Sequence, residues 1–153
     1  MPTRPAAHVP LRLLAEDVDD LEIMSAALQD SVGKVGDILF EPSRRQLTLA
    51  VNRYVWEAGE RSLKRVRCAL QLGGVMSVKS RNLRRDAPDA IVSVLAVQFE
   101  PAEAPGGLVR ITLSGDGDLA VEVECIDAAM SDVGEPWAAR GAPRHDAPDQ
   151  DRE

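Results

Sequence analysis

The chain has few of the side chains that catalytic and metal sites most often use. Its 153 residues include only two histidines, His8 and His145, and only two cysteines, Cys68 and Cys125. Nucleophilic catalysis needs an imidazole held beside a serine or cysteine, and a zinc site needs several Cys or His ligands. Both histidines lie in terminal segments that we expect to be flexible. The scarcity therefore argues against such enzymes, a metal centre and a disulfide scaffold.

The two cysteines also lack the surroundings of reactive thiols. Cys68 alternates with Val66 and Leu70, and Cys125 alternates with Val123, as residues on one buried strand face do. We interpret both thiols as small buried hydrophobic groups.

Familiar ligand motifs and long apolar runs are absent as well. The stretch "GDGD" at 115–118 lacks the Lys and Ser or Thr of a phosphate-binding loop, and it lacks the ligand spacing of a calcium loop. We predict no cofactor. No run approaches the roughly 18 apolar residues of a membrane span, and the N-terminus has no signal-peptide pattern. We therefore expect a cytoplasmic protein without membrane contact.

Catalysis by carboxylates alone is the one enzymatic mechanism that the sequence still allows. Glu57, Glu100, Glu122 and Glu124 lie on predicted strands, but the last two alternate with apolar residues and should face solvent. We predict that the protein is not an enzyme.

The charge of the chain is distributed unevenly. Between Lys34 and Arg85 there are 12 Lys and Arg but only 4 Asp and Glu, whereas the rest of the chain has 6 and 21. A basic segment of this kind either pairs with acidic parts of the same fold or binds an anionic partner.

One helix is predicted, within residues 16–33. Acids crowd its first turn, Gly33 supplies a stop, and an apolar stripe runs along one side. The stripe consists of Val18, Leu21, Met24, Ala27 and Leu28. Aromatic residues make up only 3% of the chain, so the core must consist mainly of Leu, Val, Ile and Ala.

Strands are indicated where apolar residues follow a period of two. A short strand candidate at 11–15 precedes the helix, and six strands follow at 36–42, 45–57, 65–83, 90–101, 108–113 and 119–126. Gly73 and Gly74 predict a bend within the third of these, and Asp116-Gly117 suits a tight hairpin turn. The apolar strand at 90–101 should be central in the sheet. Residues 127–134 are predicted to form a short helix.

These elements predict an α+β fold. We expect a curled, mainly antiparallel sheet of about six strands, with one N-terminal helix and a short C-terminal helix. The predicted single domain spans residues 10–137, between a flexible arm at 1–9 and a disordered tail at 138–153.

The segment "NRYVWE" at 52–57 holds the one tyrosine and one of the two tryptophans. We favour packing, with Tyr54 and Trp56 covered by a second layer or brought into the core by a bulge. The other interpretation is a stacking platform in which Arg53, Arg65 and Arg67 grip the phosphates of a single-stranded nucleic acid. The glycine-aromatic pattern of RNA-binding sheets is absent, which counts against it.

The same residues carry a resemblance to a known family. The strand from Arg53 to Glu57, and the segment from Val123 through Asp132 to Trp137, resemble an uncharacterised alphaproteobacterial family, a domain of unknown function of the DUF2948 type. The resemblance implies one intact domain ending near Trp137, and it supplies no catalytic residues because the family has no assigned activity. We further predict that Trp137 folds back as a plug and that Asp132 pairs with a strand arginine.

The predicted function is binding rather than catalysis. We expect a small assembly domain that contacts a protein partner or a second copy of itself, because open antiparallel sheets have edges that pair across two-fold axes. The alternative is an anion- or RNA-binding module that uses the basic segment 34–85. The candidate binding surface consists of Arg53, Tyr54, Trp56, Arg65 and Arg67.

Overall fold

The computed structural model of the chain describes residues 8–58 and 64–139. These residues form one α-helix, α1 (Val18–Leu28), and ten strands. The strands are β1 (Arg12–Ala15), β2 (Ser31–Lys34), β3 (Ile38–Glu41), β4 (Gln46–Tyr54), β5 (Lys64–Leu72), β6 (Val75–Arg81), β7 (Ile91–Pro101), β8 (Gly107–Leu113), β9 (Gly117–Val123) and β10 (Ala128–Ala138). Three short 3₁₀ turns, η1 (Val35–Asp37), η2 (Pro42–Arg44) and η3 (Trp56–Ala58), link or end strands.

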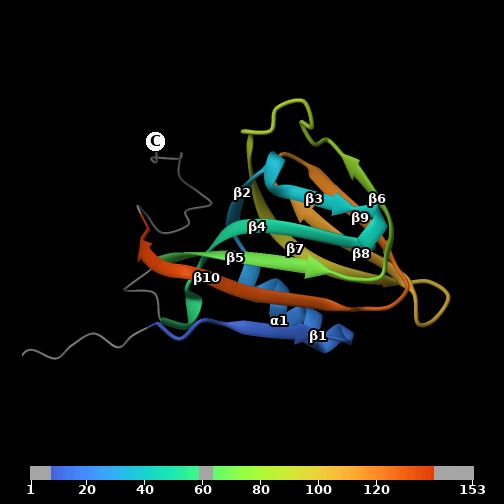
Figure 1. Cartoon of the computed structure of the whole chain (residues 1–153), viewed down its shortest axis with the longest axis horizontal. Coiled ribbons are helices and arrows are strands. Elements are labelled where there is room, and N and C mark those ends of the chain that lie inside the picture. Colours follow the sequence, from blue (N-terminus) through green and yellow to red (C-terminus); the bar gives the residue numbers. More distant parts are fainter. Residues whose placement is uncertain (1–7, 59–63, 140–153) are drawn as a thin grey trace, which may run out of the picture.

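All ten strands belong to one antiparallel sheet in the order β1-β10-β5-β4-β2-β7-β8-β9-β6, and β3 pairs with β4 beside β2. The sheet curls back on itself and brings the start of β6 next to the start of β4. There the N–H of Val75 donates to the carbonyl of Arg45 at 2.9 Å. Figure 1 shows the curled sheet, with α1 beside β1 at its base. The core lies inside the curl and consists mainly of Leu, Val, Ile, Met and Ala, as the low aromatic content predicts.

The helix follows from its local sequence. The Asp17 side chain accepts the N–H of Asp20 at 2.8 Å and caps the first turn. Leu21, Met24 and Leu28 are its buried residues and lie at helical spacing against the sheet. The helix ends before the predicted stop at Gly33, because Asp30 adopts a left-handed conformation with φ of 64° and β2 begins at the next residue. At 11 residues, the helix of the described part of the chain is too short to cross a membrane.

The predicted α+β class with about six strands is wrong. The described residues are mostly strand, and they include β2, which the sequence analysis did not identify. Gly73 and Gly74 do not bend one long strand: β5 pairs with β4 and β10, whereas β6 pairs with β9 at the far end of the sheet. Gly74 has a φ of 63°, which only glycine adopts readily, and this conformation directs the chain away from β5.

The predicted C-terminal helix is also wrong, because residues 127–134 contribute to β10. Ala128, Met130 and Asp132 alternate inward and are buried, while Ala129 and Ser131 point outward. β10 is paired on both sides, with β1 and with β5, and this two-sided pairing outweighs the helical preference of the alanines.

Two sheet predictions agree with the structure. β7 is interior, between β2 and β8. β8 and β9 form the predicted hairpin, although the positive φ angles of its turn fall on Gly115 and Asp116, one residue earlier than expected. The predicted arm and tail lie largely outside the described residues.

Candidate interaction surface

Arg53 does not lie on a surface. The alternation of β4 places it on the inner face, in phase with Leu47, Leu49 and Val51, and its exposed fraction is 0%. Asp132 lies on the inner face of β10, two strands away across β5. The Nε of Arg53 donates to Oδ1 of Asp132 at 2.7 Å, and Nη2 donates to Oδ2 at 2.7 Å. This two-pronged contact is the predicted pairing of Asp132 with a strand arginine.

The other donors of Arg53 are also occupied. Nη1 donates to the carbonyl of Tyr54 at 2.9 Å and to Oε1 of Glu57 at 3.0 Å, and Nη2 donates to Oε2 of Glu57 at 2.7 Å. A guanidinium has five N–H donors, and all five of these contacts are internal. Arg53 therefore has no donor left for a ligand and acts in the fold.

The carboxylate of Asp132 likewise has a hydrogen-bond partner on each oxygen. Its Oδ2 accepts the backbone N–H of Leu11 at 2.8 Å and lies 3.2 Å from Nε2 of His8. Burial by itself would raise the pKa of Asp132, but the hydrogen bonds from Arg53 and Leu11 outweigh it and hold this pKa below its usual value. His8, which the sequence analysis placed in a flexible arm, is thus docked on a carboxylate.

The contact between His8 and Asp132 does not assemble a catalytic triad. Among the described residues His8 hydrogen-bonds only Asp132. The thiol of Cys68 is fully buried, and burial raises its pKa to about 12, so it is a poor nucleophile. Cys125 is exposed, which corrects the prediction that both thiols are buried; it follows β9 and lies outside the alternation of that strand.

Tyr54, Trp56 and Arg65 pack on one another at one end of the sheet. Tyr54 is 3% exposed, its ring centroid lies 5.2 Å from that of Trp56, and the guanidinium carbon of Arg65 lies 3.9 Å above its ring. Arg65 also donates from Nη1 to the carbonyl of Asn52 at 2.8 Å. The arginine therefore covers the face of Tyr54 on which a base would stack.

Arg67, the last predicted site residue, is held by two partners. It donates to Oδ1 of Asn52 at 3.2 Å and to Oδ2 of Asp37 at 3.0 Å, and both charged side chains stay partly exposed. Four of the five predicted residues thus meet at one end of β4 and β5, while Arg53 points to the opposite side of the sheet.

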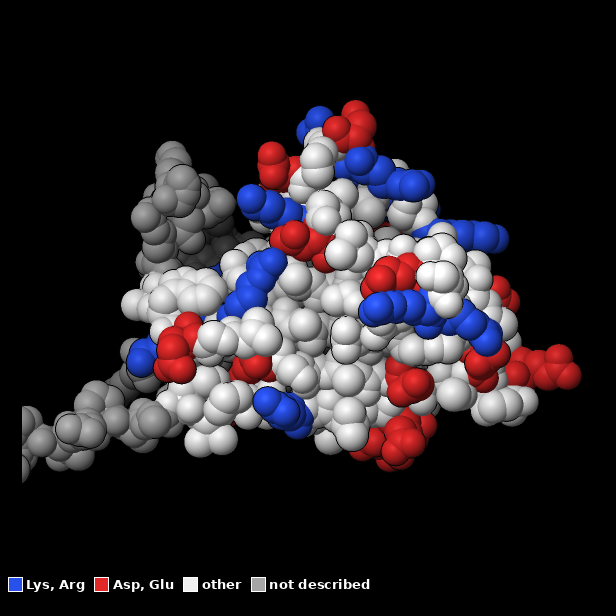
Figure 2. Space-filling model, in the orientation of Figure 1, with Lys and Arg blue, Asp and Glu red and all other residues white. Residues whose placement is uncertain are grey.

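Half of the twelve cations of the basic segment 34–85 are neutralised within the fold. Six of its cations form ion pairs: Lys34 with Asp89, Arg44 with Glu41, Arg45 with Glu124, Arg53 with Asp132 and Glu57, Arg67 with Asp37, and Arg81 with Asp118. None of these acids lies on α1. Figure 2 shows the result on one face, where Lys and Arg are interspersed with Asp and Glu.

A different surface emerges from the register of the strands. We define the outer face as the side chains of β1, β10, β5, β4 and β3 that point away from the core. Directly paired residues share a face, so Leu14, Ala129, Gln71, Thr48 and Leu39 form one row across all five strands. Arg12, Ser131, Ala69 and Ala50 form the next row. Val133, Arg67 and Asn52 form a third, and Trp137, Arg65 and Tyr54 form a fourth.

The outer face is apolar at its margins and has small residues at its centre. Leu14 is 74% exposed, Leu39 56%, Val133 49% and Trp137 43%. The second row places a serine and two alanines between these margins, and the centre of the view in Figure 2 is accordingly uncharged, with charges toward the edges. Trp137 is part of β10 and half-exposed, so the predicted plug is wrong.

The sequence analysis missed this surface for a specific reason. Its members come from strands far apart in the chain, and those of β10 fall partly in the segment that was predicted as a helix. The alternation of Ala129, Ser131 and Val133 with buried neighbours was the available signal.

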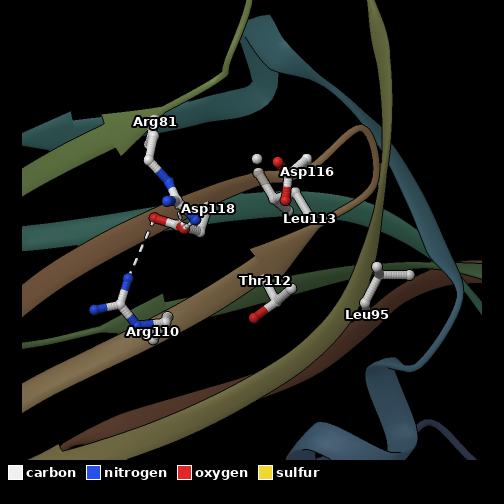
Figure 3. Close-up of a pocket in the computed structure, with 8 residues that line it drawn as sticks. Arg81, Leu95, Arg110, Thr112, Leu113, Asp116 and Asp118 are labelled. Carbon is white, nitrogen blue, oxygen red and sulfur yellow. Dashed lines mark hydrogen bonds and ion pairs between the residues drawn. The ribbon is translucent and has the colours of Figure 1, made fainter.

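A concave region on the other half of the sheet has a different character. Arg81 of β6 and Arg110 of β8 flank the buried Asp118 of β9 (Figure 3). Their closest contacts with its carboxylate are 2.7 and 3.3 Å, respectively. Arg110 also donates to Glu100 at 2.6 Å. Asp116 lines the region as well, so three carboxylates accompany the two cations and no excess positive charge is offered to an anionic ligand. In residues 8–58 and 64–139, no group of three His, Cys, Asp or Glu side chains could hold a metal ion.

Comparison with known proteins gives one match. No curated protein and no solved structure matches the chain. The model of the family DUF2948, described as a protein of unknown function, matches residues 11–145. The two stretches that carry the resemblance meet in the structure through Arg53 and Asp132. Because the match covers most of the chain, the protein belongs to the DUF2948 family of proteins of unknown function.

Proposed function

We propose that this protein is a non-enzymatic assembly domain whose outer face binds a protein surface, with a second copy of the chain as its first partner. The observation that carries the proposal is the combination of four exposed apolar side chains with a centre of small residues, Ser131, Ala69 and Ala50. Apolar side chains that stand exposed on one face of a soluble protein often mark a protein contact, and here they frame a face that also carries Arg12, Arg65 and Arg67.

The outer face is suited to a two-fold arrangement. A two-fold interface brings one patch against itself, so the patch must be self-complementary. An axis near Ala69, at the middle strand, would turn β3 of one copy toward β1 and β10 of the other. With the axis parallel to the strands, Leu39 of one copy would lie near Leu14 of the other, and the small central residues would let the two sheets approach closely.

The size of the outer face favours a weak association. The four gaps between five strands, at about 4.8 Å each, and six residue steps, at about 3.4 Å each, give an area of roughly 400 Å². Stable interfaces bury about 800 Å² per partner, so the outer face alone supports a transient or weak dimer. Measurements should therefore extend to high protein concentration.

The alternative, an anion- or RNA-binding module, has less support. Six cations of segment 34–85 already have carboxylate partners, and Arg65 is stacked on Tyr54. What favours it is the partial exposure of Arg65 and Arg67 side by side on β5. RNA binding of this kind would weaken steeply with salt, because bound phosphates release counterions.

The test is the mass of the protein in solution as a function of its concentration. We expect sedimentation to show a rise from one copy toward two, and we expect Leu14→Glu combined with Val133→Glu to abolish the rise. The matched control is Ile23→Glu, an equally exposed apolar residue (59%) on α1, which should behave like the parent chain. A parent chain that stays monomeric throughout, or a control that disrupts association equally, would refute the proposal. Salt-sensitive binding of a polyuridine RNA that is lost in Arg65→Gln with Arg67→Gln would favour the alternative.

A further inference from the structure

The curled sheet is incompletely closed between β3 and β6. Among the described residues β3 is paired only with β4, and β6 is paired only with β9. At one end the gap is closed by the hydrogen bond from Val75 to Arg45. Beyond that contact lies a cavity of about 490 Å³ between the two strands, which we name the slot. Figure 1 shows β3 and β6 at the same corner of the molecule.

The slot leaves inward-facing side chains partly uncovered. Ile38, Phe40, Val78 and Ser80 stand opposite Leu49, Leu47, Val121 and Leu119, respectively, and all four of these partners are buried. Paired residues share a face, so the first four also point toward the core. They are nevertheless only half-buried. The core is therefore open to solvent along the slot, and apolar surface there remains in contact with water.

The slot has few polar side chains, and its only charged one is positive. Arg85 is the one charged side chain among its lining residues, and Ser80 is the one side-chain hydroxyl. Arg85 is exposed and, within the described part of the chain, forms no ion pair. Arg85 is therefore a cation of the basic segment whose charge stays available beside an apolar cavity.

We propose that the slot binds a small apolar carboxylic acid, with its hydrocarbon part between β3 and β6 and its carboxylate at Arg85. Ligand sites of proteins are typically apolar cavities of about 300–1,000 Å³ with a few convergent polar groups, often at the mouths of barrels. The hydrocarbon would cover Ile38, Phe40 and Val78, and Ser80 would donate a second hydrogen bond to the acid. The slot is blocked at the Val75 end, which favours a short ligand over an extended peptide that needs a continuous path.

This site shares one lining residue, Leu39, with the outer face, but the two proposals are tested through other residues. The residues that would hold the ligand point inward from β3 and β6, whereas the assembly test uses Leu14 and Val133 on β1 and β10. Failure of one proposal therefore leaves the other standing.

The test is calorimetric titration of the full chain with decanoate below its micelle concentration, beside decan-1-ol as the uncharged analogue. We expect saturable binding of one decanoate per chain, with decanol binding more weakly. Arg85→Gln should weaken decanoate about tenfold, which is what loss of one charge-assisted hydrogen bond predicts, and should leave decanol unchanged. Arg84→Gln, the neighbouring exposed arginine that does not line the slot, is the matched control and should bind like the parent chain.

A second variant tests the location. Ser80→Phe places a ring inside the slot and should abolish binding of both compounds, provided that its circular dichroism matches the parent chain. If that variant is unfolded, Phe40→Ala, which enlarges the slot, should instead alter the decanoate affinity. The proposal fails if decanoate shows no saturable binding, if decanol binds as tightly, or if Arg84→Gln weakens decanoate as much as Arg85→Gln does.

Discussion

The sharpest stability prediction concerns Arg53, the fully buried cation of the sheet. Replacing Arg53 with Met keeps a long side chain in the same space but removes all five N–H donors. Asp132 would then remain buried with only the Leu11 N–H and His8 as partners and without the guanidinium charge next to it. An unpaired buried carboxylate is strongly unfavourable, so the free energy of unfolding should fall substantially.

The magnitude follows from the burial of each partner. Removing one member of a buried ion pair costs about 3–5 kcal/mol, and both Arg53 and Asp132 have no exposed side-chain surface. We expect about 4 kcal/mol for Arg53→Met, a large share of the roughly 5–15 kcal/mol by which domains are stable. Glu57 is half-exposed, so Glu57→Gln should cost no more than about 1 kcal/mol.

The assay is urea unfolding followed by the fluorescence of Trp56 and Trp137. Arg67→Met is the matched control, because it breaks a partly exposed Arg–Asp pair on the same sheet and should cost about 0–1 kcal/mol. Adding Asp132→Asn to Arg53→Met should restore stability, since it removes the orphaned charge. The reasoning is refuted if Arg53→Met costs no more than the control, or if the second substitution lowers stability further by its full separate cost.

Three further outcomes are expected. The pKa of Asp132 in the folded state lies below its unfolded value of about 3.9, so the ionised carboxylate contributes its full stability above that pH and loses it as the pH falls through the folded pKa. The urea midpoint of the parent chain should therefore fall as the pH is lowered below about 3.9, and that of Asp132→Asn should fall less. A thiol reagent should modify one cysteine of the native protein, at Cys125, and reach the second, Cys68, only on unfolding; rapid modification of two thiols would contradict the burial of Cys68. Gly107→Ala should lower stability by about 1–3 kcal/mol, because its Cβ would lie 2.6 Å from the carbonyl oxygen of Glu100, and a thermal melt that does not shift would show that this strand relaxes freely.

The elements that the sequence predicts well are those fixed by local interactions. The cap at Asp17 and the stripe of Leu21, Met24 and Leu28 determine α1 within a few turns of chain. The hairpin of β8 and β9 likewise depends on residues that are adjacent in sequence. The segment of β10 has no such local signature, because its alanines suit a helix as well as a strand. Its state is decided by β1 and β5, which lie far away in the chain.

The same distinction applies to the candidate site. The phase of Arg53, between Val51 and Val55, was visible in the sequence, but a lone arginine at an inward position does not reveal its counter-ion. Asp132 lies opposite only because β10 enters the sheet in one register, and that register could not be assigned while the segment was taken for a helix. The excess of cations in segment 34–85 could be counted from the sequence, but the count does not show which acids pair with them. Those acids come from loops and strands spread over the sheet.

The position of β10 has a consequence for biosynthesis. β1 pairs with β10, although the two strands lie at opposite ends of the described chain. β5 is also paired on only one edge until β10 is in place. While the nascent polypeptide is still short of residue 132, Arg53 has no Asp132 to balance it, so the native arrangement cannot form before that residue has been added. Folding should therefore be completed only after β10 has been synthesised, and a chain whose translation stops before β10 should be recognised by proteases as an unfinished product.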